Sequence, residues 1–180
     1  MSIRRSVVAA WAGLALLVMV SAGTAANGAA HAGGTFIDAT GQAIGWVRLV
    51  EDGTGRVHVN VHVAGLTPGL HGIHIHAIGA CSPTFAAAGG HYNPLGHQHG
   101  LDNPNGAHAG DLPNLIVDAD GHGRLQAKTD RVTLSPGAAT LLDGDGSAFI
   151  IHANPDDQVT NVGNGGSGAR IACAVVVATE

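Results

Sequence analysis

The sequence predicts an all-β fold, an antiparallel sandwich or barrel built from short strands. Three observations support this prediction: apolar and polar residues alternate with a period of two, turn signals recur at short intervals, and the composition disfavours long helices. Charged residues make up 12% of the chain and aromatic residues 3%, whereas glycine occupies 28 of the 180 positions. Such a composition suits strands joined by glycine-rich turns.

The clearest strand covers residues 57–63. Four valines alternate there with His58, Asn60 and His62, which is typical of a strand with one buried face. We expect His58 and His62 to be ordinary surface histidines on its polar side. Similar apolar runs predict further strands at residues 43–51, 71–76, 115–118, 124–129, 147–152 and 171–178.

Two long stretches interrupt this rhythm, at residues 81–111 and 153–169. Both are rich in Gly, Asn, Pro and His, and loops of this length inside a compact domain are usually functional. The chain contains no internal repeat and no second domain boundary. We therefore expect one domain over residues 33–180, a length that suits a single core.

Residues 1–32 are predicted to be a signal peptide. Arg4 and Arg5 precede an apolar run over residues 6–22, and small residues continue to Ala32, which is the pattern of a secretory signal cleaved at about residues 25–32. The alternative is a retained membrane anchor, because the run is nearly long enough to span a bilayer. The expected location is therefore secreted, or periplasmic and associated with the cell envelope.

Charge and cysteine content narrow the choice further. Eight basic residues stand against 13 acidic ones, which argues against a nucleic-acid surface. Cys81 and Cys173 are the two cysteines of the chain, and an even count in an exported protein indicates one disulfide. Closing a loop of this length would stabilise the fold by on the order of 4 kcal/mol. Two free buried thiols are the alternative.

The 12 histidines are the unusual feature of the composition, because histidine is the commonest side-chain ligand of transition metals. His74 and His76 are two positions apart in a predicted strand, so both side chains point to the same face and can reach one metal. Such a pair alone is weak support for a metal site. His152 ends another apolar strand, and by itself it would more often be a core histidine.

The loop at residues 81–111 gives a stronger signal. His91, His99, His108 and Asp111 are spaced along a segment too rich in Gly and Pro to form a helix. Three imidazoles and a carboxylate suit a closed tetrahedral zinc site, which would hold a loop that has little core of its own. The alternative is a flexible histidine-rich loop.

Taken together, these residues resemble the copper/zinc superoxide dismutase family, in its secreted bacterial form, over residues 34–179. The order and spacing of five motifs carry the resemblance. They are Gly72-Ile-His-Ile-His76, Gly90-His-Tyr-Asn-Pro94, His108-Ala-Gly-Asp-Leu112, His152-Ala-Asn-Pro-Asp-Asp157 and Arg170-Ile-Ala-Cys173.

The resemblance implies a Greek-key sandwich or flattened barrel of about eight strands with two long functional loops. It implies copper and zinc as cofactors, with His91 bridging them, and selects His99 over the nearby His97. The implied copper ligands are His74, His76, His91 and His152, and the implied zinc ligands are His91, His99, His108 and Asp111.

Other residues also take roles from the resemblance. Asp156 would tie a copper histidine to a zinc histidine by hydrogen bonds, and His71 would brace the active-site strand without binding metal. Arg170 would guide the anion beside copper, with His91 as the second catalytic residue. Cys81 and Cys173 would form the disulfide that anchors the first long loop to the last strand.

The implied reaction is the dismutation of superoxide to dioxygen and hydrogen peroxide, driven by a copper that cycles by one electron. The chain departs from better-known members because residues 153–169 contain no Lys or Glu, which leaves Arg170 as the expected local cation. The longer stretch at 82–90 leaves a possible homodimer interface unassigned. The alternatives are an extracytoplasmic copper-binding or metal-buffering protein on the same scaffold and a purely structural sandwich.

Overall fold

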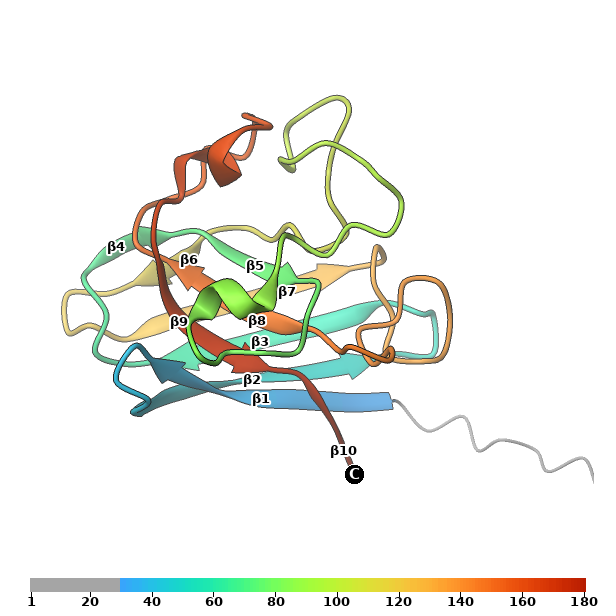
Figure 1. The fold of residues 1–180 in the computed structure, drawn as a ribbon, viewed down its shortest axis with the longest axis horizontal. Helices are drawn as coiled ribbons and strands as arrows, with labels where there is room; N and C mark the ends of the chain where they lie inside the picture. Colours follow the sequence, from blue (N-terminus) through green and yellow to red (C-terminus); the bar gives the residue numbers. More distant parts are fainter. Residues whose placement is uncertain (1–29) are drawn as a thin grey trace, which may run out of the picture.

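The computed structural model describes residues 30–180, in which ten antiparallel strands form one sheet (Figure 1). The strands are ordered β4-β6-β7-β3-β2-β1-β9-β8-β5, and β10 pairs with β1. Only Gly72 separates β4 and β5, the two ends of this path, so the sheet nearly closes into a barrel. The strands are β1 (Ala30–Asp38), β2 (Ala43–Glu51), β3 (Val57–Val63), β4 (Gly69–His71), β5 (Ile73–His76), β6 (Leu115–Val117), β7 (Gly123–Thr129), β8 (Ala148–His152), β9 (Arg170–Val175) and β10 (Val177–Thr179).

The all-β prediction is confirmed, and the alternation in β3 shows why the chain folds this way. Its four valines are buried, whereas His58 and His62 lie half-exposed on the outer face. Trp46 of β2 stacks on His62 at 4.5 Å. Inside the barrel, Phe36 and Phe149 meet edge to face at 6.5 Å, and each fully buried side chain of this size contributes about 1.5–3 kcal/mol.

The prediction of single strands over residues 71–76 and 171–178 was wrong. The first run breaks at Gly72, whose N–H donates to the Asn154 carbonyl and whose carbonyl accepts from the His152 N–H, each at 2.8 Å. A Cβ at Gly72 would lie 2.5 Å from Ser167 Oγ, so the close approach requires glycine. The second run divides at Val176 into β9, which pairs with β8 and with the end of β1, and β10, which pairs with the start of β1.

Strand β1 is the element that the sequence patterns did not reveal. It begins at Ala30, within the predicted cleavage zone, and two adjacent glycines, Gly33 and Gly34, interrupt its apolar pattern. The signal peptide and the alternative membrane anchor lie mainly in residues 1–29, outside the described residues. Within residues 30–180, no helix is long and apolar enough to cross a membrane.

The two predicted loops carry the only helical turns found between residues 30 and 180. Helix η1 (Phe85–Ala88) lies in the first loop and η2 (Gly163–Gly166) in the second. Figure 1 shows the outer parts of both loops projecting from the same side of the sheet. The loops are therefore placed to form one site together.

A third long connection, residues 130–147, joins β7 to β8 and packs over the barrel. Val132, Leu134 and Leu141 are buried in the core. The Glu51 carboxylate accepts hydrogen bonds from the Leu134 and Ser135 N–H groups, both at 2.6 Å. This connection is therefore fixed at one end by core packing and by a buried carboxylate.

Candidate metal centre

Three strand positions and one loop residue bring four histidines together. His74 and His76 project from β5 and His152 ends β8, which pairs with β5. His91 joins them through an isolated antiparallel bridge with His76. One donor atom from each of the four lies within 4.8 Å of the others. The structure thus groups all four predicted copper residues.

Each of these histidines has one buried ring nitrogen without a hydrogen-bond partner among the described residues. These atoms are Nδ1 of His74 and Nε2 of His76, His91 and His152. A buried polar nitrogen left unpaired is costly. Four such nitrogens in one cluster therefore form a donor set that fits a metal ion, and imidazole is a ligand that suits copper.

The second ring nitrogen explains why the first one is available. His76 Nδ1 donates to the Gly89 carbonyl at 2.9 Å, and His152 Nδ1 donates to the Gly168 carbonyl at 3.1 Å. Because a carbonyl only accepts, these nitrogens carry the ring proton, and the opposite nitrogen of a neutral imidazole keeps its lone pair. The backbone of both loops therefore fixes the ring tautomers.

The predicted zinc residues form a second, adjacent group. Asp111 Oδ1 lies 3.0 Å from Nδ1 of His91, 3.0 Å from Nδ1 of His99 and 3.4 Å from Nδ1 of His108. His91 Nδ1 and His108 Nδ1 are 3.2 Å apart. Ligands about 2.0–2.1 Å from a tetrahedral zinc lie roughly 3.3 Å from one another. The donor set therefore has the spacing that zinc requires.

His74 could also be grouped with this second set, since a donor atom of His74 lies within 4.8 Å of donor atoms of His91, His99 and Asp111. Its Nε2, however, donates to Asp156 at 2.6 Å. The nitrogen that remains, Nδ1, is one of the four unpartnered atoms described above. The hydrogen bond therefore places the available nitrogen of His74 in the first group.

His91 is the residue common to both groups. Its Nδ1 faces Asp111 Oδ1, whereas its Nε2 is the unpartnered nitrogen of the first group. The His91 side chain is only 3% exposed, and its ring stacks on that of His74 with centroids 4.0 Å apart. One imidazole therefore presents a nitrogen to each donor set.

Asp111 is held as an anion by the atoms around it. Burial favours the neutral acid, but hydrogen bonds from the three histidines and the backbone hold the pKa of Asp111 well below its usual range. Its Oδ2 accepts from the N–H groups of Gly100 and His108, both at 2.9 Å. Its other oxygen, Oδ1, therefore remains available to the Nδ1 atoms of the three histidines.

Asp156 connects the two groups from outside. Its carboxylate accepts from His74 Nε2 at 2.6 Å and from His99 Nε2 at 3.1 Å. Burial opposes ionisation, but these bonds lower the pKa of Asp156. Asn114 fixes its backbone through two hydrogen bonds of 2.8 Å. Gly165 approaches closely, since a Cβ there would overlap the carboxylate.

The protonation states of three histidines in the first group suit metal binding. Burial lowers the pKa of His76 to about 2, that of His74 to about 3 and that of His152 to about 4. These imidazoles are therefore neutral at pH 7 and have a free lone pair. Burial also acts against charge on His99, but Asp111 and Asp156 raise its pKa to about 9.

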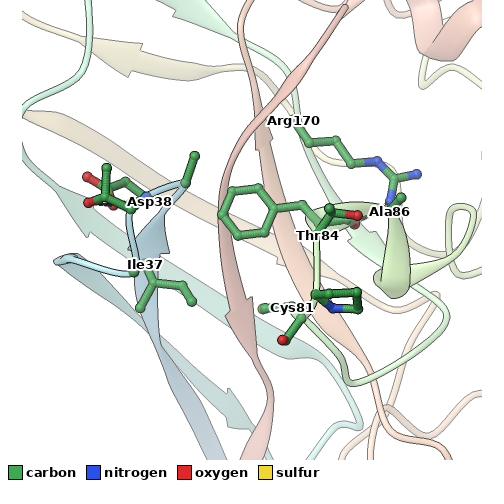
Figure 2. Close-up of a pocket in the computed structure, with 12 residues that line it drawn as sticks. Ile37, Asp38, Cys81, Thr84, Ala86 and Arg170 are labelled. Atoms are coloured by element: carbon green, nitrogen blue, oxygen red, sulfur yellow. Dashed lines mark hydrogen bonds between the residues drawn. The ribbon is translucent and has the colours of Figure 1, made fainter.

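Arg170 lies beside the first group. Its Nη1 donates to the Phe85 carbonyl at 2.6 Å and its Nη2 to the Gly89 carbonyl at 2.7 Å. The same Gly89 carbonyl accepts from His76, so one backbone oxygen sets the position of both side chains. Figure 2 shows Arg170 at the border of an open hollow of about 560 Å³ between η1 and the end of β1.

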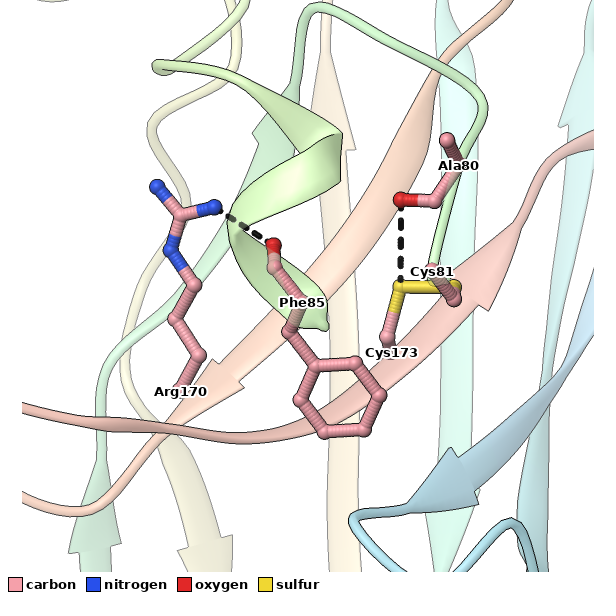
Figure 3. The surroundings of a disulfide bond; sticks show 5 residues. All are labelled: Ala80, Cys81, Phe85, Arg170 and Cys173. Atoms are coloured by element: carbon pink, nitrogen blue, oxygen red, sulfur yellow. Dashed lines mark hydrogen bonds between the residues drawn. A yellow bond between two sulfur atoms is a disulfide. The ribbon is translucent and has the colours of Figure 1, made fainter. Parts of the chain in front are cut away.

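The predicted disulfide is confirmed. Cys81 and Cys173, 92 positions apart, are bonded with their Cα atoms 5.9 Å from each other. Figure 3 shows the bond at the base of the loop that carries Phe85, whose carbonyl receives Arg170. The disulfide thus ties the Arg170-binding part of the first loop to β9.

His71 and His97 lie outside both groups. His71 is buried, with Nδ1 2.7 Å from the His152 carbonyl and Nε2 2.9 Å from the Thr67 carbonyl. It therefore braces the end of β8, in the position the resemblance implies. His97 is exposed, and its backbone N–H donates to Asn93.

Several contacts at the site have no counterpart in the sequence motifs. The Gly89 and Gly168 carbonyls orient histidines, and backbone acceptors leave no side-chain signature. Asn161 accepts a hydrogen bond from the His99 N–H at 2.7 Å, but it is one of many asparagines in the two loops. Arg131, in the third connection, donates to the Asp111 carbonyl at 2.7 Å.

Comparison with known proteins agrees with this geometry. The sequence model of the copper/zinc superoxide dismutase family matches residues 43–176. A protein from Aquifex aeolicus named superoxide dismutase (Cu-Zn) 2 is 40% identical over 163 residues, covering 89% of this chain and 93% of that protein. A Cu-Zn superoxide dismutase from Caulobacter vibrioides is 41% identical over 140 residues, covering 76% and 79%.

A solved structure gives the same result for the fold. The crystal structure of a superoxide dismutase-like protein from Bacillus subtilis matches with a TM-score of 0.76 and 40% identity, covering 81% of this chain and 97% of that one. The family match spans well over half of the sequence, and these relatives cover most of its length. The chain therefore belongs to the copper/zinc superoxide dismutase family.

Proposed function

We propose that His91 joins a copper site and a zinc site in this chain. The copper site comprises His74, His76, His91 and His152, and the zinc site comprises His91, His99, His108 and Asp111. The observation that carries the proposal is the set of four buried, unpartnered imidazole nitrogens, one of which belongs to a ring whose other nitrogen faces Asp111.

The general function follows from family membership. The chain is a superoxide dismutase of the copper/zinc type, its cofactors are copper and zinc, and its substrate is superoxide. When bound, copper supplies one-electron redox chemistry, whereas zinc has no redox chemistry and stabilises structure. Two superoxide anions and two protons yield one dioxygen and one hydrogen peroxide.

Within this reaction we assign the delivery of one proton to Nε2 of His91. Its Nδ1 lies among the zinc residues, so Nε2 is the ring atom that can release and take up a proton next to the copper residues. Asp111 and the surrounding histidines hold the ring in place throughout. The second proton comes from solvent, and Nε2 is reprotonated before the next cycle.

Arg170 is assigned to binding the substrate anion. Two of its five N–H donors are used by the Phe85 and Gly89 carbonyls, which leaves the others to contact superoxide. Burial lowers the pKa of Arg170, but an arginine remains charged at neutral pH. A cation at the edge of a cleft concentrates an anionic substrate even on a protein of net negative charge.

We also propose that the protein is exported, with its N-terminal segment either cleaved at about residues 25–32 or retained as an anchor. The charged start and apolar run of this segment support export. The Cys81–Cys173 disulfide supports it independently, because such bonds persist in oxidising compartments.

The assignment of His91 is tested by comparing wild-type protein with His91→Ala, both loaded with copper and zinc, in a steady-state superoxide assay. His97→Ala is the matched control, since His97 is exposed in the same loop. Loss of activity in His91→Ala alone supports the proposal, and equal activity in all three proteins refutes it. Wild-type protein that bound both metals but did not accelerate superoxide loss would instead favour the metal-buffering alternative.

A further inference from the structure

We infer that Arg131 is a positioning residue for the zinc site, acting through the backbone of Asp111. This inference rests on the proposed function, because it takes Asp111 as a zinc ligand. The observation behind it is a hydrogen bond of 2.7 Å from Arg131 Nη2 to the carbonyl oxygen of Asp111.

The contact is long-range and comes from outside both loops. Arg131 belongs to the connection between β7 and β8, and it lies 20 positions from Asp111. Its neighbours Val132 and Leu134 are buried in the core, and Glu51 binds the Leu134 N–H. The guanidinium therefore extends from a firmly held segment to the end of the zinc loop.

Arg131 completes the set of bonds that fix Asp111. The Asp111 N–H donates to the His108 carbonyl at 3.2 Å, and its Oδ2 accepts from two backbone N–H groups. Its carbonyl is the remaining backbone group, and Arg131 binds it. With all of these atoms fixed, Oδ1 is aimed at the histidine nitrogens without further ordering when zinc binds.

The same connection holds the start of the zinc loop. The Tyr92 hydroxyl donates to the Thr140 carbonyl at 2.8 Å, in a buried contact. Tyr92 directly follows His91, the first predicted zinc residue, so Thr140 holds the chain at that end. Arg131 holds it at Asp111, the last predicted zinc residue. The Tyr92 carbonyl in turn accepts from the Gly110 N–H at 2.8 Å, which joins the two ends of the loop.

The guanidinium of Arg131 is also incompletely paired. Its Nε is buried and has no hydrogen-bond partner within residues 30–180. A buried donor without a partner is unfavourable for stability, so stability alone does not account for an arginine at this position. We therefore assign its role to the Asp111 carbonyl.

The test uses full-length protein loaded with zinc alone, and measures zinc release to a chromogenic chelator. Arg131→Met keeps the length of the apolar stem and removes the donors, whereas Arg131→Lys keeps one cationic donor. Arg124→Met is the matched control, because Arg124 is exposed on β7. Loss of a group that orients a metal ligand typically weakens metal binding by about 10- to 100-fold.

We expect zinc release to be about 10- to 100-fold faster for Arg131→Met, intermediate for Arg131→Lys and unchanged for the control. The unfolding midpoint of each metal-free variant separates positioning from general stability. Lowered midpoints with wild-type zinc release would overturn the inference. If Arg131→Met does not fold, the rate of zinc release from Arg131→Lys is the deciding measurement. A rate equal to that of wild type would reject the positioning role of Arg131.

The two proposals fail in different ways. Wild-type protein that does not retain one zinc per chain contradicts the zinc assignment itself. Wild-type protein that retains zinc, together with an Arg131→Met variant that retains it equally well, contradicts only the role of Arg131. Cobalt substituted for zinc gives an independent readout, since a displaced Asp111 would shift its absorption bands relative to wild type.

Discussion

Nε2 of His74 donates a hydrogen bond of 2.6 Å to Oδ2 of Asp156, although the two residues lie 82 positions apart in the chain. Both side chains are fully buried. The bond connects β5 to the second long loop, and the other carboxylate oxygen receives His99 from the first loop. One carboxylate thus orients a residue of each proposed metal site.

Replacing this carboxylate should weaken metal binding while leaving the fold intact. In Asp156→Asn, a neutral amide with one acceptor oxygen replaces a charged carboxylate with two, so its hydrogen bonds to the two histidines are weaker. We expect copper and zinc affinities to fall by about 10- to 100-fold, measured by competition with a colorimetric chelator. Asp157→Asn is the control, because its exposed side chain caps a local turn that asparagine preserves. Affinities equal to wild type in Asp156→Asn would contradict this role.

Removing the cation beside His76 should slow the reaction of the fully loaded enzyme. We expect Arg170→Ala to lower kcat/KM about tenfold and to weaken its dependence on ionic strength, because the anion loses its attracting charge. The kcat/KM of Arg170→Lys should lie between those of wild type and Arg170→Ala. The measurement is the superoxide dismutation rate across a series of salt concentrations. Arg56→Ala, in the exposed turn after β2, should behave as wild type.

The metal-free protein should be most stable near pH 6.5. Burial lowers the pKa of His74, His76 and His152 below their unfolded value of about 6.5. As the pH falls below 6.5, the unfolded chain binds more protons, and each histidine reduces stability by about 1.4 kcal/mol per pH unit until its folded pKa is reached. His99 acts oppositely: its folded pKa of about 9 is raised, so its contribution is lost as the pH rises from 6.5 through 9.

Urea unfolding of the metal-free protein between pH 4 and 9 measures this profile. The acid limb should be steeper than the alkaline limb, because three histidines contribute to it. A stability that stays constant from pH 4 to 6.5 would show that these imidazoles are not buried as neutral groups.

Loss of the disulfide should destabilise the protein and displace Arg170. For the Cys81→Ser/Cys173→Ser double variant, we expect the free energy of unfolding to fall by on the order of 4 kcal/mol, since the bond closes a loop of about 90 residues. Denaturant unfolding with and without a reducing agent provides the measurement. Wild-type protein should lose stability in the reductant, whereas the double variant should be insensitive to it.

The sequence pattern predicted the all-β architecture, and the resemblance to the family implied the two groups of site residues. The alternation in β3 and the paired His74 and His76 are visible as spacings. Strand β1 was not predicted, because Gly33 and Gly34 interrupt its apolar pattern. The break between β4 and β5 at Gly72 was not predicted either. It depends on the close approach of Ser167, which is distant in the sequence.

The contacts that orient the site were harder to predict for a different reason. The Gly89 and Gly168 carbonyls act through the backbone, and any residue has a carbonyl. Arg131 reaches Asp111 from a connection with no metal-binding residue, so no motif marks it. The motifs indicated which side chains gather, whereas the tertiary structure determines which way they face.

The single residue between β4 and β5 has a mechanical consequence. Gly72 lies between β4 and β5, where the path of paired strands begins and ends; we call this point the seam of the barrel. The Gly72 carbonyl accepts a hydrogen bond from the His152 N–H. The histidines of β5 and β8 lie directly beside this seam. A metal bound by these histidines would cross-link β5 and β8 at this point of the barrel. Hydrogen exchange of the Gly72 and Ile75 amides should therefore become faster when the metal is lost, before the core unfolds.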